Sequence, residues 1–249
     1  MNIIHDCTSS YRIAVYSGLK KFSKYLKASG LCEDHMSYVP RPKFVERQST
    51  KDKRQIGYLT KPEAKKVISG EAKKDGRKKS RRWEVRDKLI ILLFLNTGIR
   101  CSAMYRLDVS DIDLQRKTIK VLEKGEVYKE VDISDNVVEL IKEWLVYRQI
   151  ILDGTQKNAL IISNRKDRAN QQTIAKIVND SAYKIDGKHI TPHKLRATYG
   201  TELHNETGDV YFVQECMGHA SPKTTELYIR GDKSRFTKKA SGIMEDFVS

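Results

Sequence analysis

The strongest constraint on the fold is an apolar segment near the middle of the chain. Residues 83–96 read WEVRDKLIILLFLN, and Thr97 and Gly98 follow directly. This segment predicts a helix buried at the centre of a domain, and glycine lets the chain turn where a helix stops. We therefore expect Arg100 at a helix end beside the core, where an arginine binds an anion or simply forms a salt bridge near the helix terminus.

Capping residues and helical periodicity predict further helices on both sides of this segment. Thr60 caps one helix, with Pro62 in its first turn, and Thr191 caps another that starts at Pro192. Gly208 and Gly218 are each expected to end a helix. The predicted helices are 12–29, one starting near 60, 83–96, 101–107, 136–152, 171–185, 192–205, 209–218 and a short one that contains Tyr228.

The expected strands are few and short. Residues 118–122 and 127–133 alternate in polarity around a tight turn at Lys124 and Gly125, which predicts a hairpin with Lys124 near its tip. Residues 159–164, ALIISN, predict another short strand. The expected fold class is mainly α with a small antiparallel β-sheet (α+β).

The division into domains follows composition. Residues 38–56 contain two prolines, many charges and little apolar periodicity, which is typical of a linker. We predict a short helical segment at 1–48, a linker at 49–57, a larger domain at 58–230 and a C-terminal tail at 231–249. The tail ends in an apolar stripe that packs on its own core or is exchanged between subunits.

An excess of positive charge points to a polyanionic partner. Lys and Arg number 47 against 32 Asp and Glu, which gives a formal net charge of +15. Residues 73–82 contain seven basic residues and one acidic residue and are expected to form a loop. DNA contact and plain solvation both fit these positions. The candidate DNA-binding residues are Lys20 and Lys24 on the first helix, and Lys73, Lys74, Arg77, Lys78, Lys79, Arg81 and Arg82 in the basic loop.

Several kinds of site are not indicated. The four cysteines form no C-x-x-C pair, which fits a reducing cytoplasm. His189 and His193 are four residues apart, but a helix starts between them, so we expect no metal site. The N-terminus lacks the pattern of a secretory signal, and no segment has the apolar length of a membrane span. The expected location is the cytoplasm, in association with the nucleoid.

Residues 191–230 bring together the side chains that could attack a phosphate. Arg196, with Arg100, would hold the non-bridging oxygens of a DNA phosphodiester. Tyr228 would attack phosphorus, and His193 would take its proton. The remaining two donors are His219, which would bind the phosphate or the nucleophile, and Lys124, which would protonate the departing sugar oxygen. No metal ion or other cofactor is required.

The chain reads TGIR, a hairpin lysine, HKLR, MGH and TTELYIR in that order. These motifs resemble the tyrosine recombinases of the phage integrase family. The intervals are 24 residues from Arg100 to Lys124, 3 from His193 to Arg196, 23 from Arg196 to His219 and 9 from His219 to Tyr228. The likeness covers about 58–230, and the match of five separate motifs makes it specific.

The resemblance implies a particular fold and activity. It implies a tyrosine-recombinase catalytic domain with a three-stranded sheet, preceded by a short helical core-binding segment. It also implies strand exchange through a 3′-phosphotyrosyl link and a Holliday junction. The partners implied are a double-stranded DNA core site with inverted repeats and a homo-tetramer on DNA, with a monomer or weak oligomer in its absence and no membrane.

Three positions depart from the pattern of the family. Ala103 stands where the family often has a glutamate that supports the first arginine, so Arg100 is expected to be held differently. Met217 replaces a leucine, a volume-conserving change. The hairpin reads EKGEVYKE, which leaves Lys124 and Lys129 as alternative general acids, and the interval favours Lys124. A type IB topoisomerase and a non-catalytic DNA-binding accessory protein are the alternative functions.

Overall fold

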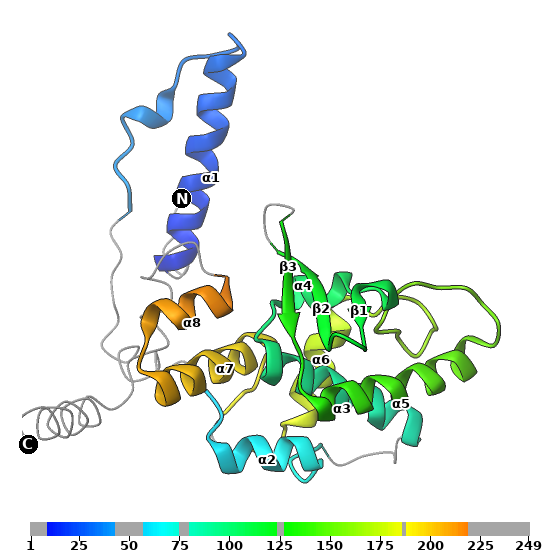
Figure 1. Cartoon of the computed structure of the whole chain (residues 1–249). Coiled ribbons are helices and arrows are strands. Elements are labelled where there is room, and N and C mark those ends of the chain that lie inside the picture. The colour runs from blue at the N-terminus through cyan, green and yellow to red at the C-terminus, as the bar shows by residue number, and fades with distance from the viewer. Residues whose placement is uncertain (1–8, 43–56, 75–79, 124–126, 186–187, 219–249) are drawn as a thin grey trace, which may run out of the picture. The chain divides into compact units, whose positions relative to one another are not determined.

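The computed structural model describes residues 9–42, 57–74, 80–123, 127–185 and 188–218 (Figure 1). The chain divides into two compact units, residues 1–55 and residues 56–249. The boundary between them falls inside the segment 49–57, of which only residue 57 is described. The finer division into segment, linker, catalytic domain and tail stays a prediction.

The first unit contains one long helix, α1 (Ser9–Ala28), and a short 3-10 turn, η1 (His35–Ser37), that packs beside it. The helix ends within one residue of the predicted end, and a left-handed glycine, Gly30, with a φ of 69°, follows it. Its start differs from the prediction: the helix begins at Ser9, three residues before the predicted start, because the helical backbone extends beyond the apolar pattern.

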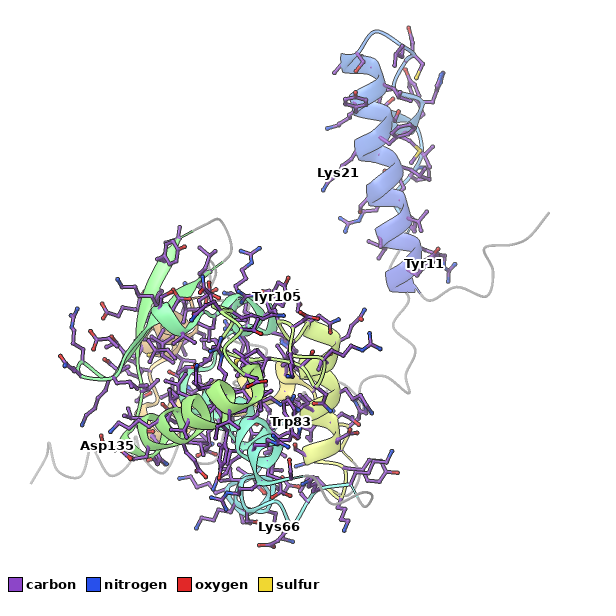
Figure 2. All side chains as sticks on the ribbon, turned by 90° about the vertical axis from the view of Figure 1, so that its right-hand side faces the viewer. Tyr11, Lys21, Lys66, Trp83, Tyr105 and Asp135 are labelled. Atoms are coloured by element: carbon purple, nitrogen blue, oxygen red, sulfur yellow. The ribbon has the colours of Figure 1, made fainter. Side chains whose placement is uncertain are left out.

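Polar bonds attach the turn to α1, whereas several apolar side chains of the helix are exposed. The Ser23 hydroxyl donates to Asp34 Oδ1 at 2.6 Å. Leu19, Phe22 and Tyr25 are each at least half exposed, as is Tyr11, which Figure 2 labels on α1. The helical period was therefore predicted correctly, but these side chains are not buried in the described structure.

The core of the second unit surrounds α3 (Arg81–Thr97), which contains the apolar segment that predicted it. Five of its side chains are no more than 1% exposed, and each such burial stabilises the fold by roughly 1.5–3 kcal/mol. Four helices pack against α3: α2 (Lys61–Ser69), α5 (Asp135–Leu152), α6 (Gln171–Ser181) and α7 (Pro192–Thr207). The five buried side chains are Leu89, Ile90, Ile91, Leu93 and Phe94.

The start of α3 corrects the predicted loop at 73–82. Ser80 has the extended backbone of an N-cap, and the helix begins at Arg81. Arg81 and Arg82 therefore belong to the first turn of α3. Apolar periodicity begins only at Trp83, which explains why the pattern placed the helix start two residues too late.

The sheet has three antiparallel strands in the order β1 (Ile112–Asp113), β2 (Thr118–Leu122) and β3 (Tyr128–Asp132). Strands β2 and β3 form the predicted hairpin, with Ile119 opposite Val131. The strand predicted at 159–164 is wrong. Only Ala159 and Ile162 form isolated bridges there, because the buried segment has no neighbouring strand to pair with along its length.

The remaining described elements complete a mainly helical unit. They are α4 (Cys101–Arg106), the 3-10 turn η4 (Val109–Asp111) and α8 (Val210–Met217). The expected fold class, mainly α with a small antiparallel sheet, is confirmed (Figure 1). Among the described residues, no helix combines the length and the apolar character that crossing a membrane requires.

Candidate active site

A glycine at the end of α3 fixes where Arg100 leaves the core. Gly98 has a left-handed φ of 60°, and its N–H donates to the Phe94 carbonyl. A β-carbon at this position would lie 2.2 Å from Cδ1 of Tyr199, so the backbone conformation and the close approach of α7 both require glycine. Arg100 then begins α4 as its N-cap residue, at the helix end where it was predicted.

Helix α7 carries His193 and Arg196 one turn apart. The side chain of Thr191 accepts from the N–H of Lys194, and Pro192 occupies the first turn, so the helix starts as predicted. His193 lies at the surface, whereas Arg196 is 4% exposed. Desolvation by the surrounding protein lowers the pKa of His193, and the charge of Arg196 lowers it further. Both effects favour the neutral imidazole, the form that a general base needs.

The two arginines meet at the C-terminal end of α8. Arg196 donates from Nη2 to the Met217 carbonyl, and from Nη1 to the Gly98 carbonyl at 2.5 Å. Arg100 donates from Nη2 to the Gly218 carbonyl at 2.9 Å. Two guanidinium groups from distant parts of the chain thus bind adjacent carbonyls of one helix end.

A third cation binds the same helix end. Lys129 on β3 donates from Nζ to the Glu215 carbonyl and to the Cys216 carbonyl, the latter at 3.3 Å. The last carbonyls of a helix lack partners within it, and the helix dipole makes them attractive to cations. The four consecutive carbonyls 215–218 all accept from cationic side chains, so α8 and both arginines form one polar assembly.

Close packing holds α8 against α7. A β-carbon on Gly200 would lie 2.4 Å from Sδ of Met217, so the glycine allows this methionine to approach α7. Met217, Val213 and Ala197 are each no more than 1% exposed and form a small cluster. Met217, the residue that replaces the leucine of the family, is thus the apolar anchor of the helix end that binds the arginines.

One tyrosine near the arginines is unsuited to nucleophilic attack. Burial raises the pKa of Tyr199 to about 12, with a further contribution from Cys216. Its phenol therefore stays protonated over the whole physiological range. Tyr199 contributes to the packing of α7 against Gly98.

Three of the six predicted catalytic residues are placed by the structure, and three are not. Arg100, His193 and Arg196 lie on α4 and α7, and Arg100 and Arg196 share the end of α8. Lys124, His219 and Tyr228 lie outside the described residues. Glu123 and Val127, which precede and follow the hairpin tip, are joined by a backbone hydrogen bond of 2.9 Å.

Residues 59–235, well over half of the chain, match the model of the phage integrase family. The chain belongs to the phage integrase family. The predicted family is thereby confirmed, and the matched residues include all six predicted catalytic positions.

Known members of the family show how far the likeness extends. Tyrosine recombinase XerC of Thermodesulfovibrio yellowstonii is 32% identical over 224 residues, which are 87% of this chain and 69% of the relative. The crystal structure of XerA recombinase has a TM-score of 0.63 and 26% identity, over 91% of this chain and 74% of that one. XerH site-specific recombinase, bound to a palindromic difH substrate, has a TM-score of 0.62 and 28% identity, over 74% of this chain and 52% of that one. The chain spans about half the length of other XerC relatives.

These comparisons confirm the predicted enzyme class of this integrase-family chain. Its relatives are named tyrosine recombinases, which cleave and rejoin DNA, and a related structure was solved with DNA bound. Site-specific recombination is thus supported over a topoisomerase-like enzyme and over a non-catalytic accessory protein.

The basic residues predicted to contact DNA have several environments in this integrase-family chain. Lys73 pairs with Glu84 at 3.0 Å and Arg81 with Glu143 at 2.9 Å, so both are ion-paired without DNA. Lys74 lies over the ring of Tyr183, and Arg82 contacts Ser80. Lys20 and Lys24 lie on α1. The other candidates, Arg77, Lys78 and Lys79, lie outside the described residues.

The contacts that two residues make within the site were not predicted from the sequence. Glu123 forms an ion pair with Nη1 of Arg100, and Lys129 binds the end of α8. Ala103 was the available signal for Glu123, because an arginine without its usual carboxylate needs another partner. Nothing in the sequence indicates that Lys129 reaches α8, because that contact joins residues 86 positions apart.

Proposed function

We propose that this chain recombines DNA at a core site with inverted repeats, through a 3′-phosphotyrosyl intermediate formed by Tyr228. The observation that carries the proposal is the meeting of Arg100 and Arg196 at carbonyls 217 and 218. Two guanidinium groups held side by side match the paired, charge-assisted hydrogen bonds that phosphate oxygens accept. His219 follows these carbonyls directly in the chain.

The cleavage step uses the cationic groups in two ways. Arg100 and Arg196 bind the non-bridging oxygens and stabilise the extra negative charge of the pentacoordinate transition state. His193, in its neutral form, accepts the phenolic proton as the oxygen of Tyr228 attacks phosphorus. His219 donates a hydrogen bond to the phosphate or to the nucleophile.

The leaving group completes the reaction. The P–O5′ bond breaks, Lys124 gives its proton to the departing 5′ oxygen, and the 3′ phosphate stays on Tyr228. The 5′-hydroxyl of a second strand then displaces the tyrosine by the reverse sequence. The phosphotyrosyl ester keeps the bond energy, so rejoining needs no cofactor.

Trapping on a nicked DNA substrate tests the nucleophile. When the short fragment carrying the 5′-hydroxyl diffuses away, rejoining stops and a covalent complex accumulates. We expect the wild-type chain and Tyr199→Phe to form this complex, and Tyr228→Phe to bind the same DNA without forming it. Denaturing gel electrophoresis separates the outcomes, and an adduct with Tyr228→Phe would refute the assignment.

The assembled enzyme is proposed to be a homo-tetramer on two core sites that is cytoplasmic and associated with the nucleoid. The XerH structure with palindromic DNA supports a core site of two inverted repeats. The tail at 231–249 is proposed to reach a neighbouring subunit, and its apolar stripe suits that contact. Lys20, Lys24 and the basic residues at 73–82 are proposed to bind the DNA backbone.

A further inference from the structure

A carboxylate lies against one of the two proposed phosphate-binding arginines. Glu123 directly follows β2, and its Oε2 forms an ion pair with Nη1 of Arg100. The backbone N–H of Glu123 donates to the Val127 carbonyl at 2.9 Å, which closes the base of the hairpin tip. The backbone and side chain of Glu123 are therefore both fixed, and Lys124 is the next residue.

This ion pair differs from the surface pairs of the same chain. The Glu123 side chain is 14% exposed and that of Arg100 is 32% exposed, whereas Lys61 and Glu206 are both about two-thirds exposed. A carboxylate that is largely removed from water loses hydration, so it persists there only when a cation compensates for it. Exposed ion pairs contribute little to the stability of the fold. A shielded pair such as this one constrains the geometry of both groups.

The pair leaves Arg100 able to bind a phosphate. A guanidinium group has five N–H donors in a rigid plane. Glu123 engages Nη1 and the Gly218 carbonyl engages Nη2, so within the described part of the chain further hydrogens on both nitrogens and on Nε are left for a phosphate. Two anchors from different elements fix the plane of the group, while about a third of the side chain faces solvent.

Among the described residues, no other carboxylate is paired with Arg100. Helix α4, which Arg100 begins, reads CSAMYR and has no acidic side chain. Ala103, one turn along that helix, is 2% exposed and has no group that could bind a guanidinium. The hairpin thus supplies a contact that α4 does not.

We infer that Glu123 is a positioning residue that holds the guanidinium of Arg100 in the orientation needed to bind the scissile phosphate. Because Glu123 precedes Lys124, the same ion pair also ties the base of the hairpin tip to the first arginine. This inference rests on the proposed function.

The test compares Glu123→Gln with Glu130→Gln. Glu130 lies on β3 and forms an ion pair with Arg116 at 3.7 Å, so its change removes the same charge from the same sheet away from Arg100. Single-turnover cleavage of the nicked substrate and DNA affinity are measured for both. We expect Glu123→Gln to cleave about 10- to 100-fold more slowly with little change in affinity, because misplacing a binding group slows the reaction by up to that order. Glu130→Gln should match the wild type.

Glu123→Ala with added formate separates positioning from a purely structural role. A small carboxylate that enters the vacated space should restore part of the cleavage rate, while chloride at equal ionic strength should not. Cleavage by Glu123→Gln at the wild-type rate or faster would overturn the inference. Faster cleavage is the result expected if the carboxylate merely competes with the phosphate for Arg100. Loss of thermal stability without formate rescue would also overturn it. Failure of the wild-type chain to form any adduct would refute the proposed function instead.

Discussion

At the scale of single residues, the environment of His193 determines when it acts as a base. Desolvation and then the charge of Arg196 lower its pKa from the usual 6.5. The neutral imidazole, which accepts the proton of Tyr228, therefore stays populated below pH 6.5. A histidine with an unshifted pKa would already lose half of its base form at that pH.

The pH dependence of cleavage checks this role. At subsaturating DNA, where the profile reports the free enzyme, we expect the rate to fall on acidification with a midpoint below 6.5. His193→Gln should lack this limb and cleave slowly at every pH. A midpoint above 6.5, or the same limb in the variant, would contradict the assignment.

Thermal unfolding over the same pH range is the necessary control. Burial also lowers the pKa of His204, which is 5% exposed on α7. The folded state therefore resists protonation of His204, and stability falls as pH drops below 6.5. The acidic limb is assigned to catalysis only over the pH range in which the unfolding temperature, although it falls, stays well above the temperature of the cleavage assay.

At the scale of elements, the hairpin carries two lysines with different proposed tasks. Lys129 already uses Nζ to bind two carbonyls of α8, which suits a positioning residue better than a proton donor. Lys124 is left as the proposed general acid. Because Lys129 binds the end of α8, we expect its loss to loosen α8. The two arginines that bind the same helix end would then be held less firmly.

A DNA substrate with sulfur in place of the bridging 5′ oxygen distinguishes the two lysines. A thiolate leaves without protonation, so it bypasses a missing general acid. We expect Lys124→Ala to cleave ordinary DNA about 10²- to 10⁴-fold more slowly and to recover on the sulfur substrate. Lys129→Ala should be slowed on both substrates. Recovery of Lys129→Ala alone would assign the proton to that residue.

Among the elements, helix ends are the feature that the sequence predicts well. Caps at Thr60, Thr191, Gly98 and Gly218 were predicted correctly because each signal lies within a few residues of the helix end it determines. The strand at 159–164 was wrong because strand formation needs a partner elsewhere in the chain. Motif spacing likewise selected Arg100 and Arg196, but not the α8 carbonyls that they bind.

At the scale of the whole molecule, the relevant quantity is the formal net charge of +15. Such a charge makes copies of the chain repel one another, which opposes assembly in the absence of a polyanion. DNA phosphates would neutralise this charge and allow subunits to approach. The charge that attracts DNA would therefore also make oligomerisation depend on DNA.

Mass photometry over a salt series tests that dependence. Without DNA we expect monomers or weak oligomers, and with a DNA site of two inverted repeats we expect tetramers that hold two duplexes. Affinity should fall steeply with salt, by about 10³- to 10⁵-fold between 50 and 200 mM if six to ten phosphates are contacted.

Deletion of 231–249 should leave binding by single subunits intact and abolish the tetramer, because the proposed exchange of the tail is lost. Tetramers without DNA, or an affinity that does not change with salt, would contradict this account of assembly.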